Sequence, residues 1–452
     1  MFYRTFRAKI RFLLFFTAVM SLRLPAADET VLTLLATSDL HGNIAQIEQA
    51  VAPAVAAARK SDPEVIYLDA GDVAQGTFGA SLNHGGGILA KLASAGCEIF
   101  VPGNHELEYG FEEFKKLVRS FPNTVLAANL HAPELKEAYK PWVILERKNV
   151  KIAFIGMMLK ELNNAFPVEK ERFNTLPYNA VLRREVNAVR AAGAEIIVLV
   201  LHAGKYSAGE NLYEILSNFP GIDLVIGSHT HRADPGSRVG NAWYIQPPAH
   251  GKKMLKALIR FDKKLRRVNC IESSLLDLPY FPAPEPPEAY EKVDNKKHDK
   301  LDFPAHIIRE YLQSDWAIYA VGSRRKLTDL IRKKQPDKLD YYNVFPYCDR
   351  IITVPVSGGE LQEIVREYLK FTHKRKMYLA VSGFSFSSSR GKLRGIRALD
   401  RQKVCTLAIS TYAAAGAGGQ LPGIRRILEN KIDRTGLDNA PEIMYLLTGK
   451  NK

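Results

Sequence analysis

Cysteine is scarce in this chain, and no two cysteines have the C-x-x-C spacing. The four are Cys97, Cys270, Cys348 and Cys405. This pattern excludes zinc-ribbon and thioredoxin-like sites. In an exported protein, Cys348 and Cys405 form the preferred candidate disulfide because both fall in the second half. Burial as small unpaired residues is an equally good alternative.

Apolar runs long enough to cross a membrane are also missing. The run Phe12–Leu22 is shorter than the about 20 residues that a spanning helix needs. Four basic residues precede it, and the segment Leu24–Ala27 after it resembles a cleavage site. This order predicts a signal peptide over residues 1–27, with an uncleaved membrane anchor as the alternative. We therefore expect an exported protein, periplasmic or secreted.

The chain has 452 residues, more than one hydrophobic core usually serves, so two domains are expected. Strand-like and helix-like segments alternate between residues 28 and 275, which predicts an α/β catalytic domain. Residues 276–300 are polar and rich in proline, and we interpret them as a linker. Residues 301–452 would form a second, smaller α+β domain.

Five apolar runs of strand character in the first domain each end at a polar motif. The motifs are Ser38–Asn43, Gly71–Asp72, Gly103–Glu106, His202 and Gly227–His231. Ligand-binding residues in α/β proteins gather at the carboxyl ends of strands, so these motifs are expected to meet.

The motifs supply carboxylate, imidazole and amide groups, which suit Zn, Mn or Fe. Each has an ordinary alternative: a Gly-Asp pair is usually a turn, and a lone histidine after a buried strand is usually a core residue. Their combination in one order instead predicts a site for two divalent metal ions. The candidate ligands are Asp39, His41, Asp72, Asn104, His202, His229 and His231.

With these motifs, the sequence resembles the calcineurin-like metallophosphoesterase superfamily, and more closely its exported 5′-nucleotidase, UDP-sugar hydrolase and 2′,3′-cyclic phosphodiesterase family. The resemblance covers roughly residues 30–250 and, more loosely, 315–422. It implies a four-layer αββα catalytic domain followed by a 5′-nucleotidase-like domain. It also implies one metal bound by Asp39, His41, Asp72 and His231, and a second bound by Asp72, Asn104, His202 and His229.

The implied chemistry is hydrolysis of a phosphate ester. Two cations about 4 Å apart neutralise the phosphoryl oxygens and lower the pKa of a bound water, so that hydroxide attacks phosphorus. His105 would stabilise the transition state or assist the leaving oxygen. The family often places an aspartate three residues after this histidine, where this chain has Glu108. Glu108 is therefore the expected partner of His105, and Glu106 is the competing one.

The second domain matches the nucleoside-binding pattern of the family only in part. The segment Ala320–Arg325 lacks the asparagine of the family motif but retains an arginine, Arg325. Tyr412 retains an aromatic face for stacking on a base, and Tyr378 or Phe384 would supply the other face. Gly418 stands where the family has an aspartate. Core packing is the alternative role for each aromatic residue.

The formal net charge is +15, and many of the basic residues lie in the second domain. Such a field attracts anionic substrates, and an alternative target is nucleic acid or an anionic lipid surface. Solvated helix faces are the simpler explanation, and nothing indicates a partner protein. We expect a hydrolase of small anionic phosphate esters, preferably nucleoside 5′-monophosphates. The alternatives are a phosphodiesterase for cyclic nucleotides, nucleotide sugars or other anionic esters, and a non-catalytic binding module that retains the fold.

Overall fold

The computed structural model describes residues 28–160, 172–206, 212–217, 219, 221–283, 300–347, 349–397, 399–417, 420–433 and 440–448. The predicted signal peptide lies outside these residues, as do most of the predicted linker, Cys348 and Gly418. Cys405 is a free cysteine buried in a strand, so the preferred pairing with Cys348 is wrong, and the alternative of a small buried residue holds for Cys405. Within the described residues, every helix is too short or too polar to cross a bilayer.

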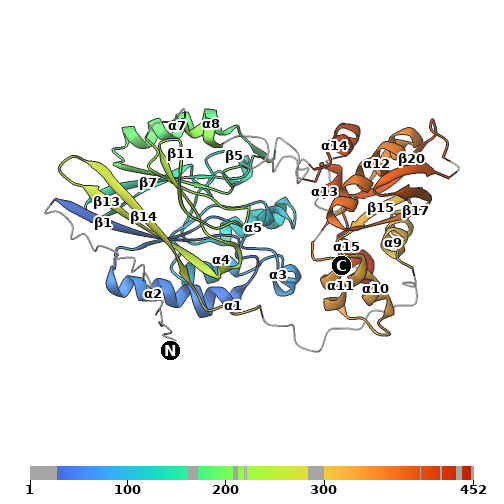
Figure 1. The fold of residues 1–452 in the computed structure, drawn as a ribbon, viewed down its shortest axis with the longest axis horizontal. Coiled ribbons are helices and arrows are strands. Elements are labelled where there is room, and N and C mark those ends of the chain that lie inside the picture. Colours follow the sequence, from blue (N-terminus) through green and yellow to red (C-terminus); the bar gives the residue numbers. More distant parts are fainter. Residues whose placement is uncertain are drawn as a thin grey trace, which may run out of the picture.

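Two six-stranded sheets form the centre of the first half (Figure 1). The first has the strand order β14-β13-β1-β2-β3-β4, with bounds β1 Glu29–Thr37, β2 Ile66–Asp69, β3 Ile99–Phe100, β4 Thr124–Val125, β13 Lys253–Asp262 and β14 Arg267–Asp277. The second has the order β11-β12-β10-β9-β7-β6, with bounds β6 Trp142–Arg147, β7 Val150–Met157, β9 Ile196–Leu201, β10 Leu224–Ile226, β11 Asp234–Val239 and β12 Ala242–Gln246. A short pair, β5 Leu130–His131 and β8 Asn174–Thr175, lies beside them.

Alternation along the strands explains why both faces of each sheet are covered. In β9, Ile196, Val198 and Val200 belong to the core between the two sheets, whereas Ile197, Leu199 and Leu201 pack toward the helices. The helices are α1 Ile44–Gln46, α2 Ala52–Ser61, α3 Phe78–Leu82, α4 Ile88–Ser94, α5 Phe111–Ser120, α7 Tyr178–Ala191 and α8 Leu212–Ser217. With α7 and α8 over one sheet and α1 and α2 over the other, the predicted four-layer αββα arrangement is confirmed.

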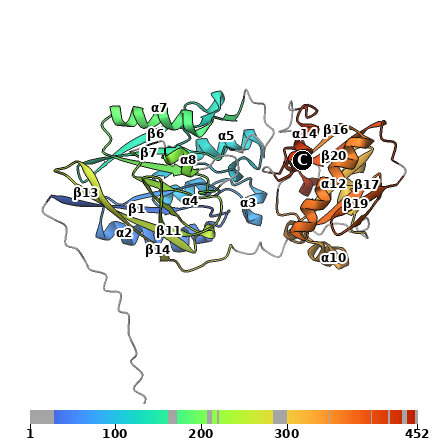
Figure 2. The ribbon, with the colours of Figure 1, turned by 45° about the horizontal axis from the view of Figure 1, so that its top comes forward.

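The second half is a smaller unit with its own sheet, ordered β16-β20-β15-β17. Its strands are β15 Trp316–Val321, β16 Ile351–Ser357, β17 Tyr378–Ser382 and β20 Val404–Ser410, with the hairpin β18 Phe386–Ser389 and β19 Lys392–Ile396. Its helices are α9 Phe303–Leu312, α10 Arg324–Arg332, α11 Lys338–Val344, α12 Gly358–Arg375, α13 Thr411–Ala414, α14 Pro422–Leu428 and α15 Ile443–Thr448. The expected α+β character of this half agrees with its mixed sheet. Figure 2 shows it beside the end of the first half that carries α3 and α5.

Candidate active site

The polar motifs meet because β1, β2 and β3 run parallel in one sheet, as do β9 and β10 in the other. Backbone hydrogen bonds join the loops that follow these strands. Asp39 N donates to Gly71 O at 2.7 Å, and His41 N donates to Asp72 O at 3.0 Å. The loop positions are therefore set by backbone contacts, independently of the candidate ligand side chains.

The first ligand group consists of Asp39, His41 and His231, whose ligand atoms all lie within 4.8 Å of one another. His41 Nε2 lies 2.9 Å from His231 Nε2, and His231 Nε2 lies 3.4 Å from Asp39 Oδ1. Among the described residues, nothing hydrogen-bonds to the buried Asp39 Oδ1. Convergent nitrogens with an unsatisfied carboxylate oxygen fit a cation at this point.

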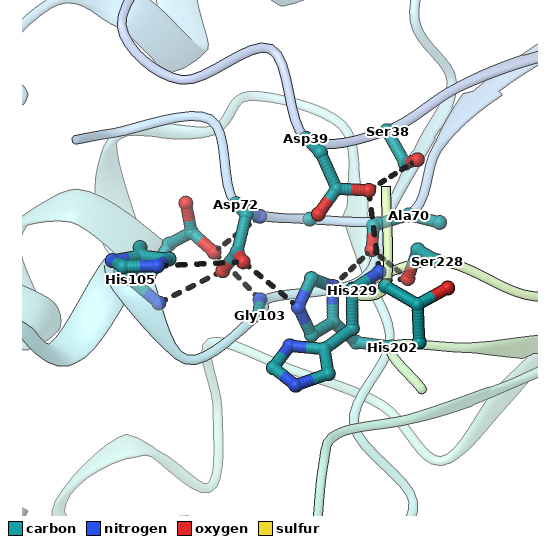
Figure 3. A network of polar contacts seen from close by, with 12 residues as sticks. Ser38, Asp39, Ala70, Asp72, Gly103, His105, His202, Ser228 and His229 are labelled. Carbon is teal, nitrogen blue, oxygen red and sulfur yellow. Dashed lines mark hydrogen bonds and ion pairs between the residues drawn. The ribbon is translucent and has the colours of Figure 1, made fainter. Parts of the chain in front are cut away.

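The second group consists of Asp72, His202 and His229, also within 4.8 Å. His202 Nε2 lies 3.1 Å from Asp72 Oδ2, an ion pair drawn in Figure 3, and among the described residues it has no hydrogen-bond partner. His229 Nδ1 and the nearby Asn104 Oδ1 are buried and equally without a hydrogen-bond partner there. Four unsatisfied ligand atoms at one end of the fold, counting Asp39 Oδ1, fit the two divalent cations that the motifs predict.

Two of the histidines are oriented through their second ring nitrogen. His202 Nδ1 lies 2.6 Å from the carbonyl oxygen of Ala70, and His41 Nδ1 lies 3.1 Å from that of Gln75. A carbonyl only accepts, so each Nδ1 carries a proton and each Nε2 faces its candidate ligand group. This is the usual arrangement of metal-binding histidines.

Several candidate ligands have an unusual backbone conformation. Asp39, His41, Asp72, His229 and His231 all have positive φ, between 48° and 70°. Residues with side chains adopt this region at a cost of about 1–3 kcal/mol each, and such strain concentrates at functional sites. The fold therefore holds these side chains in directions that an unstrained loop would not give.

The histidines of the site differ in the direction of their pKa shifts, because burial and nearby charge act in opposite directions. Burial lowers the pKa of His41 and of His229 to about 4, which keeps both rings neutral as ligation requires. Burial also opposes protonation of His202 and His105, but the charge of Asp72 raises the pKa of His202 to about 9. Asp72 together with Glu108 raises the pKa of His105 to about 10.

The two acids near His105 have different contacts. His105 Nδ1 lies 3.0 Å from Glu108 Oε2, and His105 Nε2 lies 4.0 Å from Asp72 Oδ2. The buried Glu106 carboxylate instead accepts four backbone N–H groups, from Asp72, Val73, Ala74 and Gly103, at 2.6–3.0 Å. Of the two predicted alternatives, Glu108 is the residue in contact with His105.

Comparison with known proteins agrees with this geometry. Residues 32–233 match the model of the calcineurin-like phosphoesterase family. This chain carries a calcineurin-like phosphoesterase domain. The matched range contains every candidate metal ligand.

Curated relatives of the phosphoesterase domain include 5′-nucleotidases. The chain is 25% identical over 232 residues to the rat (Rattus norvegicus) 5′-nucleotidase, covering 46% of this chain and 39% of that protein. It is 29% identical over 180 residues to the NAD 5′-nucleotidase of Haemophilus influenzae, covering 38% of this chain and 28% of that protein. The matches thus span less than half the length of these relatives.

Solved structures extend the similarity of fold to both halves. A Staphylococcus aureus structure superposes with a TM-score of 0.71 at 17% identity, covering 93% of this chain and 96% of that one. The 5′-nucleotidase precursor of Thermus thermophilus gives a TM-score of 0.62 at 17% identity, with the same coverage. The two-domain 5′-nucleotidase fold therefore extends beyond the phosphoesterase domain.

A cavity of about 610 Å³ opens beside the candidate metal centre and reaches into the second half. At one end it is lined by Asn104, His105, Glu108 and His229 of the phosphoesterase domain. At the other end it is lined by Tyr347, Asp349, Arg350, Phe371, Arg375 and Tyr412. The cavity joins the candidate metal ligands to aromatic and charged groups of the second half.

The predicted substrate residues are distributed unevenly around this cavity. Tyr412 lines it. Arg325 does not, because its side chain is 93% exposed and points to Asp329 at 4.0 Å. Tyr378 does not line it either; its hydroxyl donates to Asp302 at 2.9 Å, and the guanidinium of Arg324 lies over its ring. Phe384 packs against the core of the second half.

Sequence reasoning missed several side chains in and around the site. Tyr347, Asp349 and Arg375 line the cavity but carry no recognisable motif. Burial, with the nearby Glu108 charge, raises the pKa of Asp349 to about 7, and the Tyr319 hydroxyl donates to it at 3.0 Å. His250 lies beside the first ligand group, with ring centroids 5.4 Å from His41. The only sequence feature that could have indicated His250 is the glycine that directly follows it.

Proposed function

We propose that the protein is a metal-dependent phosphomonoesterase that releases phosphate from nucleoside 5′-monophosphates. The observation that carries this proposal is the single cavity that joins Asn104, His105 and His229 to the aromatic residues of the second half. One end offers cation-binding groups for a phosphate, and the other offers Tyr347 and Tyr412 for a planar base. The names of the 5′-nucleotidase relatives support the same substrate class.

The residues present fit two divalent cations of Zn, Mn or Fe type. Asp39, His41 and His231 would hold the first, and Asn104, His202 and His229 the second, with Asp72 between them. When bound, the cations would neutralise phosphoryl oxygens and make a water molecule more acidic.

Hydrolysis adds a water oxygen to phosphorus and breaks the bond between phosphorus and the ester oxygen. His105 is placed to serve the departing oxygen, because it lines the cavity beside both ligand groups. A protonated imidazole at this position could give its proton to the leaving alkoxide. Glu108 fixes the ring by accepting from His105 Nδ1 at 3.0 Å. The products are a nucleoside and inorganic phosphate.

The nucleoside would lie at the far end of the cavity. Tyr412 is 37% exposed and Tyr347 is 52% exposed, so both rings present surface to a ligand. A base stacked on an aromatic ring gains about 1–3 kcal/mol. Asp349 and Arg375 lie among them and can bind the hydroxyl groups of the ribose.

We further propose that the protein acts after export. The basic and apolar residues 1–27 support a signal peptide, which would place the enzyme in the periplasm or outside the cell. Extracellular and periplasmic nucleotides would then be its substrates.

Phosphate release by the purified protein tests the proposal. With Mn²⁺ or Zn²⁺ added, 5′-AMP is compared with glycerol phosphate and a bis-aryl phosphodiester. We expect kcat/KM for 5′-AMP to exceed both by at least about 10-fold, because glycerol phosphate has no ring to stack and the diester is not a phosphomonoester. Equal turnover of all three would exclude the nucleotidase function, and no turnover would favour a binding module.

Matched variants test the position of the base. Tyr412→Leu should raise KM for 5′-AMP about 10-fold while leaving turnover of glycerol phosphate unchanged. Tyr311→Leu is the control, because Tyr311 is exposed and does not line the cavity. An identical response of the two variants would exclude Tyr412 as a stacking residue.

A further inference from the structure

A second hollow of about 850 Å³ is lined mainly by residues of α12 and α14. We call it the basic groove. Its charged lining comprises six basic and three acidic side chains, namely Arg366, Lys370, Lys374, Arg375, Arg401 and Arg426, and Glu360, Glu363 and Glu367. The proposed reaction uses none of these residues except Arg375.

The three acids of the basic groove are engaged by other groups. Glu360 pairs with Lys431 at 2.6 Å, and Glu363 pairs with Arg366. Glu367 accepts the backbone N–H groups of Gly423 and Ile424 at the start of α14, at 2.9 and 2.5 Å.

The other five basic side chains of the groove have no carboxylate partner. Among the described residues, no carboxylate oxygen lies within 4.0 Å of the charged groups of Lys370, Lys374, Arg375, Arg401 or Arg426. A concave surface with this excess of positive charge attracts anions.

The basic groove adjoins the catalytic cavity. Phe371 and Arg375 line both hollows, and the Arg375 guanidinium lies over the Phe371 ring at 4.9 Å from its centroid. A nucleotide with its 5′-phosphate near His105 and its base near Tyr412 would place its sugar between these ends, in the cavity that Arg375 also lines. Any further phosphate on such a nucleotide would meet positive charge at the mouth of the groove.

We propose that the basic groove binds the additional phosphates of a nucleotide extended on its 3′ side. This inference rests on the proposed function, and it names the substrate class as 5′-phosphorylated nucleotides with at least one more phosphate. Nucleoside 3′,5′-bisphosphates and short 5′-phosphorylated oligonucleotides share this chemistry. The groove supplies binding only; the reaction remains release of the 5′-phosphate.

Substrate comparison tests the groove. kcat/KM is measured for 5′-AMP, adenosine 3′,5′-bisphosphate and the 5′-phosphorylated adenosine dinucleotide, at about 50 and 200 mM salt. We expect the extended substrates to exceed 5′-AMP about 10-fold at the lower salt, with the preference shrinking at the higher salt. A higher kcat/KM for the dinucleotide alone would mean that the groove binds a continuing nucleotide chain. A higher kcat/KM for the bisphosphate as well would mean that the groove binds the additional phosphate itself.

The variant Lys370→Gln/Lys374→Gln should abolish most of this preference and lower the salt dependence, since each phosphate contact contributes about one unit to the salt slope. The matched control is Lys392→Gln/Arg394→Gln, which removes two exposed charges of β19 that line neither hollow. The control should retain the wild-type preference. A preference that survives in the groove variant, or that is equally lost in the control, would overturn the proposal.

Binding without turnover separates this inference from the proposed function. Fluorescence anisotropy of a labelled 5′-phosphorylated trinucleotide is measured with EDTA present. Salt-sensitive binding that the groove variant loses would support the groove even if no phosphate were released. Hydrolysis of 5′-AMP with no higher kcat/KM for the extended substrates would support the proposed function but contradict phosphate binding in the basic groove. Binding of the protein to anionic lipid vesicles, measured in parallel, without binding of the trinucleotide would also contradict the groove proposal.

Discussion

Glu106 and Glu108 stand two residues apart and make contacts of different kinds. Glu106 is fully buried, and its carboxylate satisfies four backbone N–H groups around Asp72 and Gly103. Glu108 reaches the cavity and contacts His105. The first acid stabilises the loops of the site, and the second contacts the side chain proposed to be catalytic.

Glutamine at each position should therefore give different losses. Glu108→Gln is expected to lower kcat for 5′-AMP about 10- to 100-fold with little change in KM or stability, because His105 loses its charged partner. Glu106→Gln is expected to cost about 2–4 kcal/mol in free energy of unfolding, because its NH₂ group meets N–H donors. Steady-state kinetics and urea unfolding distinguish the two. Glu113→Gln, in a surface ion pair with Lys116, is the neutral control. Unchanged kcat in Glu108→Gln would contradict the positioning role.

Asp349 predicts a pH dependence of stability. Its pKa is raised to about 7 in the folded protein, from 3.8 in the unfolded chain, by burial and by Glu108. Between these values the folded protein holds a proton that the unfolded chain has lost, so stability falls as pH rises through this window. The effect is at most about 4 kcal/mol, and less because the cavity admits water.

Asp349→Asn should remove this dependence. The amide still accepts the hydrogen bond from Tyr319 and cannot ionise. In urea unfolding, the variant should be more stable than the wild type at about pH 8 and nearly equal at about pH 4. A difference in stability between the two proteins that stays constant over this range would show that Asp349 ionises normally.

At the scale of elements, the residues of the candidate site lie in the loops and short turns that follow strands. Gly103 follows β3, and a Cβ added there would lie 2.2 Å from Asp72 Oδ1 and 2.5 Å from the His202 ring. Gly103→Ala should therefore displace both candidate ligands and abolish metal binding and activity, with the circular dichroism spectrum retained. In Gly79→Ala, the new Cβ would meet nothing within 4 Å, so this helix variant should remain active. Normal metal content in Gly103→Ala would contradict the described packing.

Strand periodicity explains which residues of the candidate site could be predicted from the sequence. Residues that directly follow apolar strands, such as Asp39, Asp72 and His202, were found because parallel strands end at one edge. The contact of His105 with Glu108 depends on the 3₁₀ turn His105–Leu107, in which residues three apart lie on one side. The polar pattern alone left Glu106 and Glu108 as alternatives, because it does not define that turn.

At the scale of the molecule, the cavity lies where the two halves meet. Arg350 Nη2 donates to the carbonyl oxygen of Tyr109 at 2.9 Å, and Gln75 Nε2 donates to that of Pro346 at 3.1 Å. The sequence indicated two domains, but Tyr347, Asp349 and Arg375 come from loops and a helix end that only tertiary contacts bring together. Arg325 was predicted from its motif and Tyr378 as a second stacking face, yet local partners hold both away from the cavity.

The proposed binuclear centre is tested most directly by anomalous diffraction from crystals grown with Mn²⁺. We expect two anomalous peaks about 4 Å apart on either side of Asp72. One would lie among Asp39, His41 and His231, and the other among Asn104, His202 and His229. Asp72→Asn crystals should lose at least one peak. A single peak in the wild type, or two peaks elsewhere in the molecule, would contradict a two-metal site at these residues.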